Sequence, residues 1–440
     1  MKKVVKFGGS SLADSHQFEK VANIIHSDPS RVYVIPSAPG KRFPADTKVT
    51  DLLIKSYNTA VSGQDPTPVV DEIRARYQEI IDGLSLSISL DEEFETILNF
   101  LKGDDLYLDY IASRGEYLNG RLMAAYLGFE FIDPYEVIFF NEEGNLNTYK
   151  TDKMMSARLA EVPQAVIPGF YGHGKDDRVK TFSRGGSDVT GSIVAANAKA
   201  DIYENWTDVS GFLVADPRIV KNPVPIHTIT YRELRELSYM GASVLHEDAI
   251  FPVRTKGIPI NIKNTNRPQD EGTWIVESTA RKPAYTITGI AGKKGFCATL
   301  ITKDMMNSEI GFGRKVLQAY EENNISFEHM PSGIDTMTIV VHESEFLEKE
   351  QQVVSAIHRL AQPDNVEIES DLALIAVVGR GMKSQRGTAA RIFSALAHAR
   401  VNVRMIDQGS SELNIIIGVA NEDFETAIRA IYDIFVLTKL

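Results

Sequence analysis

The chain has 440 residues, of which 43 % are hydrophobic and 24 % are charged, so it is long enough for two or three globular domains. The formal net charge is −12 and no basic tract occurs, which argues against nucleic acid as the main partner. No apolar run approaches a membrane span, the N-terminus lacks the apolar core of a signal peptide, and the only cysteine is Cys297. We therefore expect a cytoplasmic protein with no internal disulfide and no membrane partner.

The first predicted strand starts at Val4 and runs into the glycine turn Gly8-Gly9-Ser10. A helix with an apolar face is predicted at residues 18–25. A strand, a Gly-Gly-Ser turn and a helix together resemble a phosphate-binding turn, although the lysine precedes the glycines, unlike the order of a Walker A loop. Lys6 lies inside the apolar strand, where a charge is costly without a partner. An ordinary strand-to-helix turn with a surface lysine is the alternative.

A second strand is predicted at residues 31–35, and small residues follow it through Gly40. Loops at the carboxyl ends of strands are where α/β sheets bind ligands. The apolar pattern over residues 68–102 predicts two helices packed on the sheet. A further helix is predicted from Ser113, which puts Glu116 near its first turn, where the helix dipole stabilises a carboxylate. A ligand role and a structural role for Glu116 are both open.

The segment Thr181 to Asp188 reads Thr-Phe-Ser-Arg-Gly-Gly-Ser-Asp and precedes a helical run. Gly185 and the glycine after it allow consecutive N–H groups to converge on an anion, and Ser187 or Asp188 is a good N-cap for the helix. Arg184 adds a two-pronged donor suited to a carboxylate, whereas Asp188 is better suited to orienting a nearby cation. A capped helix after a glycine turn is the structural alternative.

Residues 201–206 are predicted to form another strand, which leads into a loop with Thr, Asp and Arg side chains that reaches Arg218. Such a loop beside an aromatic residue can hold a purine and its phosphates. His246 has no second ligand at zinc spacing and is interpreted as structural. Residues 258–264 are predicted to be the last strand of the sheet, with a domain boundary near Pro283.

The last third of the chain contains an internal repeat with an offset of 76 positions, which relates Gly311 to Gly387 and Gly333 to Gly409. The two units, at about 295–345 and 371–421, each predict the order strand, glycine turn, helix, strand, turn, strand. Two copies of a small α+β unit are expected to pack together, because one copy buries only a modest core. The pair suits an effector-binding module, and a dimerisation domain is the alternative.

The ordered motifs resemble those of aspartokinases, and the resemblance covers essentially the whole chain. They are Lys6 to Ser11, Ser113 to Glu116, Ser183 to Asp188, Trp206 to Val209 and Ala215 to Arg218. The resemblance implies an α/β amino acid kinase fold, a mostly parallel sheet between helix layers, over residues 1–282. It implies tandem α+β ACT domains over residues 283–440. The implied reaction phosphorylates the side-chain carboxylate of L-aspartate with Mg-ATP, the first step toward lysine, threonine and methionine.

The resemblance also assigns residues to roles. Lys6 contacts the transferring phosphate, Asp188 orients that lysine, and the backbone of Gly8, Gly9 and Ser10 binds the phosphates. Aspartate is bound by Ser37, Thr50, Glu116, Arg184 and Ser187, with Arg184 at its α-carboxylate and Glu116 at its α-ammonium. The nucleotide is bound by Trp206, Thr207, Asp208, Asp216 and Arg218. No residue is assigned to a metal. The chain departs from many relatives at Ser243, where they have lysine, and at Leu213, where they have tyrosine.

Lysine, with threonine as a second candidate, is expected to inhibit by binding the first ACT unit. The paired regulatory domains suggest a homodimer or homotetramer. The expected effector residues are Met306, Ser308, Glu309, Ser326, Phe327, Glu328 and Asp335. Three of them are acids where the second repeat has Gln385, Arg404 and Ser411, so only the first copy suits the ammonium groups of lysine. A solvated acidic face is the alternative. An inactive amino-acid sensor and a same-fold kinase acting on another carboxylate, such as N-acetylglutamate, are the competing functions.

Overall fold

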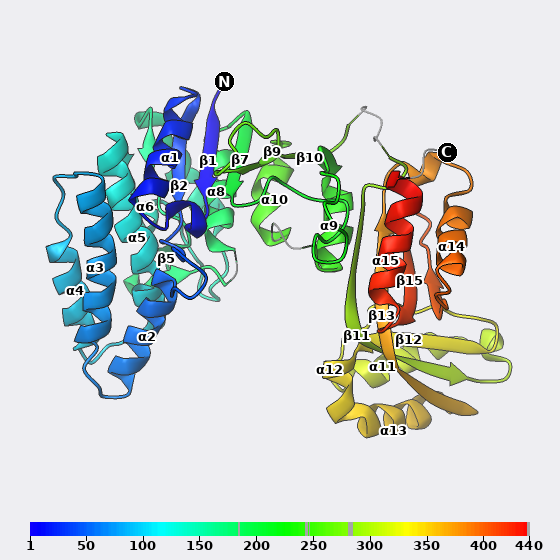
Figure 1. Ribbon diagram of the computed structural model, residues 1–440. Helices are drawn as coiled ribbons and strands as arrows, with labels where there is room; N and C mark the ends of the chain where they lie inside the picture. The colour runs from blue at the N-terminus through cyan, green and yellow to red at the C-terminus, as the bar shows by residue number, and fades with distance from the viewer. Residues whose placement is uncertain (184, 243–244, 246, 280–284, 438–440) are drawn as a thin grey trace. The chain divides into compact units, whose positions relative to one another are not determined.

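The computed structural model describes residues 1–183, 185–242, 245, 247–279 and 285–437 (Figure 1). The chain forms two compact units. The first comprises residues 1–212 and 225–231 with the described residues from 245 to 279. The second comprises the segments 213–224 and 232–242 with the described residues from 285 onward. Arg184, Ser243 and His246, which the sequence singled out, lie outside the described residues.

The first unit is built on an eight-stranded sheet with the order β3-β4-β2-β1-β7-β9-β10-β8. All the neighbouring strands are parallel except β9 and β10. The strands are β1 (Lys3–Phe7), β2 (Arg31–Pro36), β3 (Glu130–Phe131), β4 (Ala165–Val166), β7 (Ile202–Thr207), β8 (Thr228–Thr230), β9 (Ile260–Asn264) and β10 (Thr273–Val276). A separate hairpin pairs β5 (Tyr171–His173) with β6 (Val179–Thr181). The prediction that residues 258–264 form the last strand is wrong, because β10 follows β9 and pairs with it.

Strand β1 lies at the point where the order of the strands reverses. The chain continues from β1 to β2 on one side, whereas β7 pairs with β1 on the other. Loops from the two neighbouring strands leave the sheet in opposite directions at such a point, and ligands bind in the resulting crevice. The turn predicted to bind phosphate follows β1 directly, so the fold puts it at the position where α/β sheets bind ligands.

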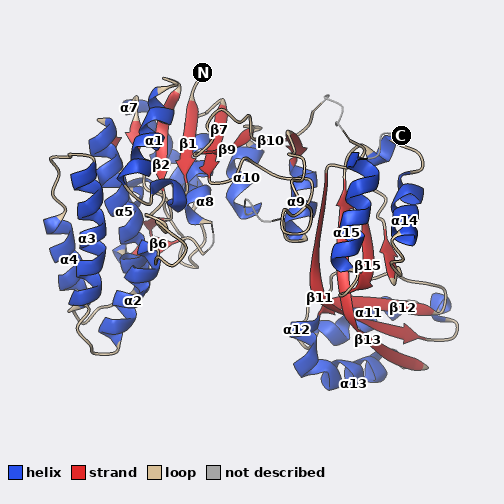
Figure 2. Ribbon diagram, in the orientation of Figure 1, coloured by secondary structure: helices blue, strands red, loops and turns tan. Residues whose placement is uncertain are grey.

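Helices cover both faces of this sheet (Figure 2). One face packs its apolar side chains, such as Val5 and Phe7, into a core shared with the helices α1 to α5. The other face carries α8, which contacts β1, β2 and β7 and packs against α10. The helices are η1 (Gly9–Leu12, 3-10), α1 (Ser15–His26), α2 (Val49–Val61), α3 (Thr67–Gly83), α4 (Asp91–Leu101), α5 (Leu108–Leu127), α6 (Pro134–Val137), α7 (Thr148–Glu161), η2 (Lys175–Asp177, 3-10), α8 (Gly186–Asn197) and α10 (Glu247–Thr255).

The second unit is built on a five-stranded antiparallel sheet with the order β12-β11-β13-β15-β14. Its strands are β11 (Gly289–Thr302), β12 (Thr336–His342), β13 (Asn365–Val378), β14 (Met405–Asp407) and β15 (Asn414–Ala420). Its helices are α9 (Tyr231–Tyr239), η3 (Met306–Ser308, 3-10), α11 (Phe312–Glu321), α12 (Glu343–Phe346), η4 (Leu347–Lys349, 3-10), α13 (Glu350–Ala361), η5 (Met382–Ser384, 3-10), α14 (Thr388–His398), α15 (Phe424–Tyr432) and η6 (Asp433–Leu437, π).

The internal repeat is visible in the geometry of the second unit. Gly311 and Gly387 begin α11 and α14 with φ angles of 84° and 83°, a left-handed conformation that favours glycine. The short helices η3 and η5 precede them at the same offset. The two copies share β11 and β13, and both long strands bend where Gly295 (φ 88°) and Asp371 (φ 62°) interrupt the extended backbone.

Two segments that the sequence assigned to the catalytic domain pack within the second unit. Glu233 on α9 is fully buried and binds the Arg380 guanidinium at 2.9 Å and the Thr288 hydroxyl at 2.5 Å. In the segment 213–224, the N–H of Val224 donates to the hydroxyl of Tyr432 on α15 at 3.0 Å. The contacts therefore join these segments to the repeats, even though they precede the predicted boundary at 282.

Within the described residues, the helices are too short or too polar to cross a bilayer.

Candidate active site

The turn after β1 has the backbone of a phosphate-binding site. Gly8 is fixed by its own N–H, which donates to the carbonyl of Trp206 at 3.0 Å. Gly9 and Ser10 then open the 3-10 helix η1, and the first N–H groups of a helical turn have no partner inside it. These two N–H groups are therefore the ones suited to phosphate oxygens, whereas the N–H of Gly8 is already used.

Lys6 and Asp188 form an ion pair with 2.6 Å between Nζ and Oδ1. Their side chains are 11 % and 17 % exposed. Asn205 on β7 also donates to Asp188 Oδ1, at 2.8 Å. The ion pair explains how a lysine is tolerated inside the apolar strand β1, because a buried charge needs a partner with good geometry. A Cβ atom on Gly8 would lie 3.8 Å from Lys6 Nζ, so the ammonium group is beside the turn.

The start of α8 differs from the sequence prediction. The N-cap residue is Gly185, which has a φ angle of 56°. No side chain makes a capping hydrogen bond to the start of the helix within the described residues. Ser187 and Asp188 lie in the first turn, so the prediction that either of them is the N-cap is wrong. The reason is steric: a Cβ atom on Gly186 would be 2.4 Å from the ring of Phe170, and the glycines let the chain turn into the helix at Gly185, two residues before Ser187.

Ser187 and Ser37 lie near one another although they are far apart in sequence. The N–H of Gly169 donates to the carbonyl of Pro36 at 3.2 Å, next to Ser37. A Cβ atom on Gly169 would lie only 2.5 Å from Ser187 Oγ, so the two residues are in close contact. Asn119 on α5 donates to the carbonyl of Ser37 at 2.6 Å and fixes this loop.

Glu116 lies in the middle of α5 and not near its start, because the helix begins at Leu108. The prediction that the helix dipole stabilises this carboxylate is therefore wrong. The neighbouring Gly115 packs on Ala38 and on Val49 of α2, where an added Cβ atom would lie 2.8 Å and 3.6 Å from their side chains. This brings Glu116 close to the loop that carries Ser37 and to the first turn of α2, which carries Thr50.

The Glu116 carboxyl group is buried, and it has no cation as an ion-pair partner among the described residues. Burial raises its pKa to about 8, although the backbone N–H of Ala38 and the charge of Lys6 act in the opposite direction. Its Oε2 atom has no hydrogen-bond partner in the described part of the chain. A buried carboxylate oxygen without a donor costs free energy, and a ligand ammonium group would supply that donor.

Trp206 is 1 % exposed and belongs to the core of the first unit. Its indole N–H donates to Glu204 Oε2 at 2.9 Å, and its ring stacks on Phe7 with 5.9 Å between centroids. The Arg31 guanidinium lies 5.3 Å from the centre of the indole ring. The side chain is thus fully engaged in packing, and its assignment to the nucleotide pocket stays a prediction.

The other predicted nucleotide residues divide between the two units. Thr207 and Asp208 follow β7 in the first unit, where the Thr207 hydroxyl is 3.2 Å from Asp208 Oδ1. Asp216 and Arg218 belong to the second unit and form an ion pair at 2.6 Å. The hydrogen bond from Arg218 lowers the pKa of Asp216. Their contact with a nucleotide stays a prediction.

The predicted effector residues also fall into two groups. Met306 is buried, and Asp335 Oδ1 accepts the N–H of the adjacent Met305 at 3.0 Å, beside the start of β12. Glu309 is paired with Lys303 and Lys315, at 2.6 Å each, so its charge is already compensated. The exposed Ser308 belongs to this group.

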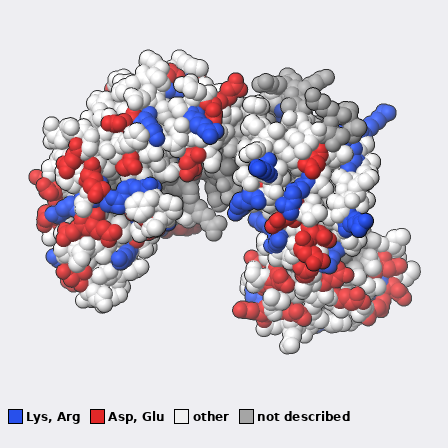
Figure 3. All heavy atoms as spheres, viewed as in Figure 1, with Lys and Arg blue, Asp and Glu red and all other residues white. Residues whose placement is uncertain are grey.

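The second group is Ser326, Phe327 and Glu328, which precede β12 in sequence. The N–H of Glu328 donates to the carbonyl of Val340 on β12 at 2.8 Å. Glu328 pairs with His342 at 3.3 Å. Acidic side chains also gather over α12 and α13 of the same repeat (Figure 3). The structure therefore does not join the three acids into one free carboxylate cluster.

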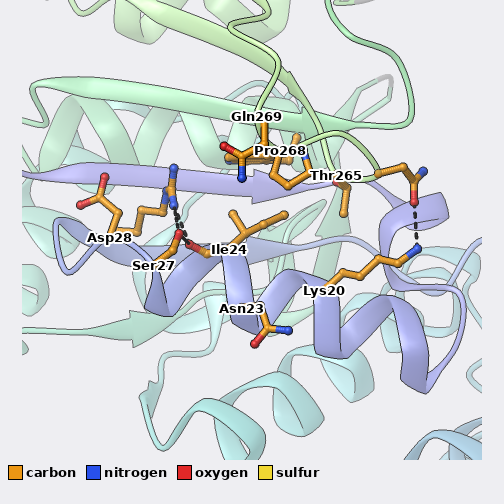
Figure 4. Close-up of a pocket in the computed structure, with 11 residues that line it drawn as sticks. Lys20, Asn23, Ile24, Ser27, Asp28, Thr265, Pro268 and Gln269 are labelled. Atoms are coloured by element: carbon orange, nitrogen blue, oxygen red, sulfur yellow. Dashed lines mark hydrogen bonds between the residues drawn. The ribbon is translucent and has the colours of Figure 1, made fainter.

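A polar cleft of about 660 Å³ lies beside α1 in the first unit (Figure 4). Its wall includes Thr265, whose hydroxyl is 2.7 Å from that of Ser11 behind the phosphate turn. Two of its charged lining residues are already paired, because Arg31 binds Glu204 and Asp28 binds Lys3, each at 2.8 Å. Of the predicted site residues, only Trp206 lines it. The cleft is separate from the cluster formed by Lys6, Glu116 and their neighbours.

Sequence reasoning missed the residues that hold this cluster in place. Asn205 orients Asp188, and Asn119 fixes the Ser37 loop. Arg76 on α3 binds the carbonyl oxygens of Gly40 and Thr47, at 2.8 Å and 2.6 Å. No separate signal in the sequence indicated Asn205, because its strand also contains Glu204 and Thr207 and is not uniformly apolar.

Comparison with known proteins shows the family. The amino acid kinase family matches residues 1–264, and the ACT domain matches residues 375–435. Aspartokinase 3 of Bacillus subtilis is 43 % identical over 447 residues, which cover 98 % of each chain. The chain belongs to the aspartokinase family. The resemblance seen in the ordered motifs and the predicted fold class are confirmed, and the family assignment makes the chain a kinase.

Solved structures of the family agree with this fold. The aspartate kinase of Clostridium acetobutylicum is 51 % identical, with a TM-score of 0.89 over 99 % of this chain and 100 % of the other. E. coli aspartokinase III in complex with lysine and aspartate is 25 % identical, with a TM-score of 0.73 over 98 % and 99 % of the chains. The same enzyme in complex with aspartate and ADP is 23 % identical, with a TM-score of 0.75 over 100 % of both chains, and shares the fold.

Proposed function

We propose that this chain transfers the terminal phosphate of Mg-ATP to the side-chain carboxylate of L-aspartate. The product is 4-phospho-L-aspartate, and the reaction is the first step toward lysine, threonine and methionine. The observation that carries the proposal is the buried Glu116, near the Ser37 loop and the start of α2 with Thr50, whose Oε2 atom is without a partner among the described residues. A free α-ammonium group is the ligand that best satisfies such an oxygen.

The reaction needs positioning and cations more than it needs a base. The side-chain carboxylate of aspartate has a pKa of about 3.9 and is already ionised at neutral pH, so no proton has to be removed before attack. The obstacle is the approach of two anions. Lys6 supplies a preorganised charge beside the turn, and the N–H groups of Gly9 and Ser10 supply further donors. Asp188 keeps the lysine in place.

Mg²⁺ enters this scheme as part of the Mg-ATP substrate. The described residues contain no group of three or more His, Cys, Asp or Glu side chains that could hold a metal. The ion is expected to travel with the phosphates, because Mg²⁺ binds mainly phosphate oxygens and waters and needs only one or two carboxylates from a protein. Arg184, by family resemblance, pairs with the α-carboxylate of aspartate.

Regulation by an end-product amino acid is part of the proposal, with lysine as the first candidate and threonine as the second. The E. coli relative has been solved with lysine and aspartate, and the chain has the same arrangement of a kinase followed by an ACT pair. We place the effector at the first repeat, around Met306 and Asp335, and expect a homodimer or homotetramer in the cytoplasm. Because Glu309 is already paired, backbone groups and Asp335 contribute more to this site than Glu309 does.

The experiment that tests the reaction is ATP- and Mg-dependent hydroxamate formation with aspartate, glutamate and N-acetylglutamate as acceptors. Aspartate alone should give hydroxamate at a high rate. An inactive sensor gives none with any acceptor, although Lys6 and Asp188 are both present and paired, which argues against that alternative. A preference for N-acetylglutamate would refute the role of Glu116, because an acylated amine has no ammonium group to offer.

A further inference from the structure

The loop between β2 and α2, residues 40–48, is held in a fixed position beside the phosphate turn. Arg76 is 4 % exposed and donates to the carbonyl oxygens of Gly40 and Thr47, the two ends of the loop. It also lies 3.4 Å from Asp46 in the same loop. A buried arginine that hydrogen-bonds both ends of the loop restricts its motion, even though most of the loop is exposed to solvent.

Gly40 is in direct contact with the phosphate turn. Its N–H donates to the carbonyl of Gly9 at 2.8 Å. A Cβ atom on Gly40 would lie 2.6 Å from the carbonyl carbon of Gly9 and 2.8 Å from the nitrogen of Ser10, so only glycine fits there. Lys41 is the next residue, and its Cα atom is about 3.8 Å from that of Gly40. A lysine side chain therefore starts one residue away from the groups proposed to bind phosphate.

Two exposed lysines of the loop, Lys41 and Lys48, have no ion-pair partner in the described part of the chain, and Lys41 is the one next to Gly40 and the phosphate turn. Arg42 is bound to Asp46 at 3.0 Å and to Glu79 at 2.8 Å. Lys41 is exposed and has one weak contact, with the carbonyl of Pro44 at 3.4 Å. No carboxylate of the described residues lies within ion-pair distance of it.

The cation already assigned to the reaction is compensated, because Lys6 is paired with Asp188 at 2.6 Å. The turn therefore receives two or three phosphate charges from ATP with little net positive charge of its own. An additional cation is what such a site needs in order to bring a second anion, the acceptor carboxylate, close to the phosphate.

We propose that Lys41 is a second phosphate-contacting residue, which binds the terminal phosphate of the nucleotide across the turn from Lys6. The loop fixed by Arg76 supplies the position, and the exposed side chain turns toward the phosphate when the nucleotide is bound. The proposal rests on the proposed kinase reaction and specifies one further contact within it. Because Lys41 is exposed and has a flexible stem, its contribution depends on the ligand being present.

The test compares Lys41→Met and Lys41→Arg with Lys102→Met, which removes an exposed lysine at the end of α4. Lys41→Met should raise the KM for ATP or lower kcat by about tenfold or more, the loss typical of one charge-assisted contact. The arginine variant should stay within a few-fold of wild type, as should the control. All three should unfold at the wild-type temperature, because the side chain of Lys41 makes no strong contact in the free protein.

Binding separates this inference from the kinase proposal. A non-hydrolysable ATP analogue and AMP are titrated into the full chain by calorimetry. Lys41→Met should weaken the triphosphate analogue by about tenfold and leave AMP unchanged. Equal binding of both nucleotides by Lys41→Met and Lys102→Met, with equal kcat and KM, would overturn the inference. If wild-type protein forms no aspartyl hydroxamate, the proposed reaction fails, and the binding comparison still decides the role of Lys41.

Discussion

Lys6 on β1 and Asp188 on α8 are 182 positions apart in sequence and form a 2.6 Å ion pair at the edge of the phosphate turn. The pair has two functions that can be separated. It makes a buried charge tolerable in the strand, and it holds an ammonium group where phosphate is expected. Each function predicts a different effect of mutation.

Lys6→Ala should lower kcat by on the order of 10²–10³, the usual loss for one preorganised donor. The variant should also unfold at a lower temperature, because Asp188 is left with Asn205 alone. Combining Lys6→Ala with Asp188→Asn should restore much of the thermal stability and none of the activity. Recovery of kcat in the double variant, measured by coupled ADP release, would contradict a catalytic role for the lysine.

The affinity for aspartate should depend on pH through Glu116. In the free chain its pKa is raised from 4.5 to about 8 by burial, so ionisation destabilises the folded state as the pH rises through that window. An ammonium group at Oε2 favours the ionised form. Aspartate binding should therefore release a proton, and its KM should fall as the pH rises toward 8, by on the order of tenfold per unit well below the pKa.

The matched control for this prediction is Glu116→Gln, which keeps the shape and removes the titration. It should bind aspartate weakly at every pH and release no proton, as measured by calorimetry in buffers of different ionisation enthalpy. A steep pH dependence that survives in Glu116→Gln would assign the effect to another group.

Gly9→Ala should destabilise the protein, whereas Gly8→Ala should be tolerated by the fold. A Cβ atom on Gly9 would lie 2.8 Å from the carbonyl oxygen of Ala38, but one on Gly8 meets its nearest atoms at 3.7 Å and 3.8 Å. Overpacking of this kind costs about 1–3 kcal/mol. Urea unfolding of the two variants checks the difference, and an equal loss in both would mean that the turn is less closely packed on the Ala38 loop than described.

Asp335→Ala should raise the lysine concentration needed for inhibition and leave kcat and the KM for aspartate nearly unchanged without lysine. The reason is that coupling between distant sites is typically about 1–3 kcal/mol and acts through a shift between states. Ser411→Ala, at the equivalent position of the second repeat, is the control and should not change inhibition. Inhibition by lysine is measured for both variants at a fixed aspartate concentration. A larger effect of Ser411→Ala would mean that the effector binds the second repeat.

Much of the first unit could be predicted because its chemistry is local in sequence. The strand before Gly8 and the helix pair at residues 68–102 were visible as apolar periodicity, and the structure has β1, α3 and α4 there. Element ends were less certain. The helix with Glu116 begins at Leu108, five residues before the predicted start. The mixed polar and apolar residues of its first turn fit a loop as well as a helix, so the pattern did not place the helix end.

Long-range pairing was the part that the sequence could not reveal. Asn205 contacts Asp188 because β7 pairs with β1 in the sheet, and the sequence does not reveal this order of the strands. Nothing in the sequence around Glu233 indicates that its partner is Arg380, which is 147 positions away. A buried polar residue carries no periodic signal that distinguishes it from an exposed one, so both contacts needed the fold to be known first.

The burial of Glu233 among Arg380 and Thr288 has a consequence for protein engineering. A fragment ending at the apparent domain boundary would keep the glutamate and lose both of its partners. Removing one partner of a buried pair is strongly destabilising, so such a fragment is expected to aggregate or to lose helix α9. Chimeras that exchange regulatory halves between aspartokinases should therefore carry residues 213–224 and 232–242 along with the tail. The compact unit that contains the repeats is therefore discontinuous in the sequence of this chain.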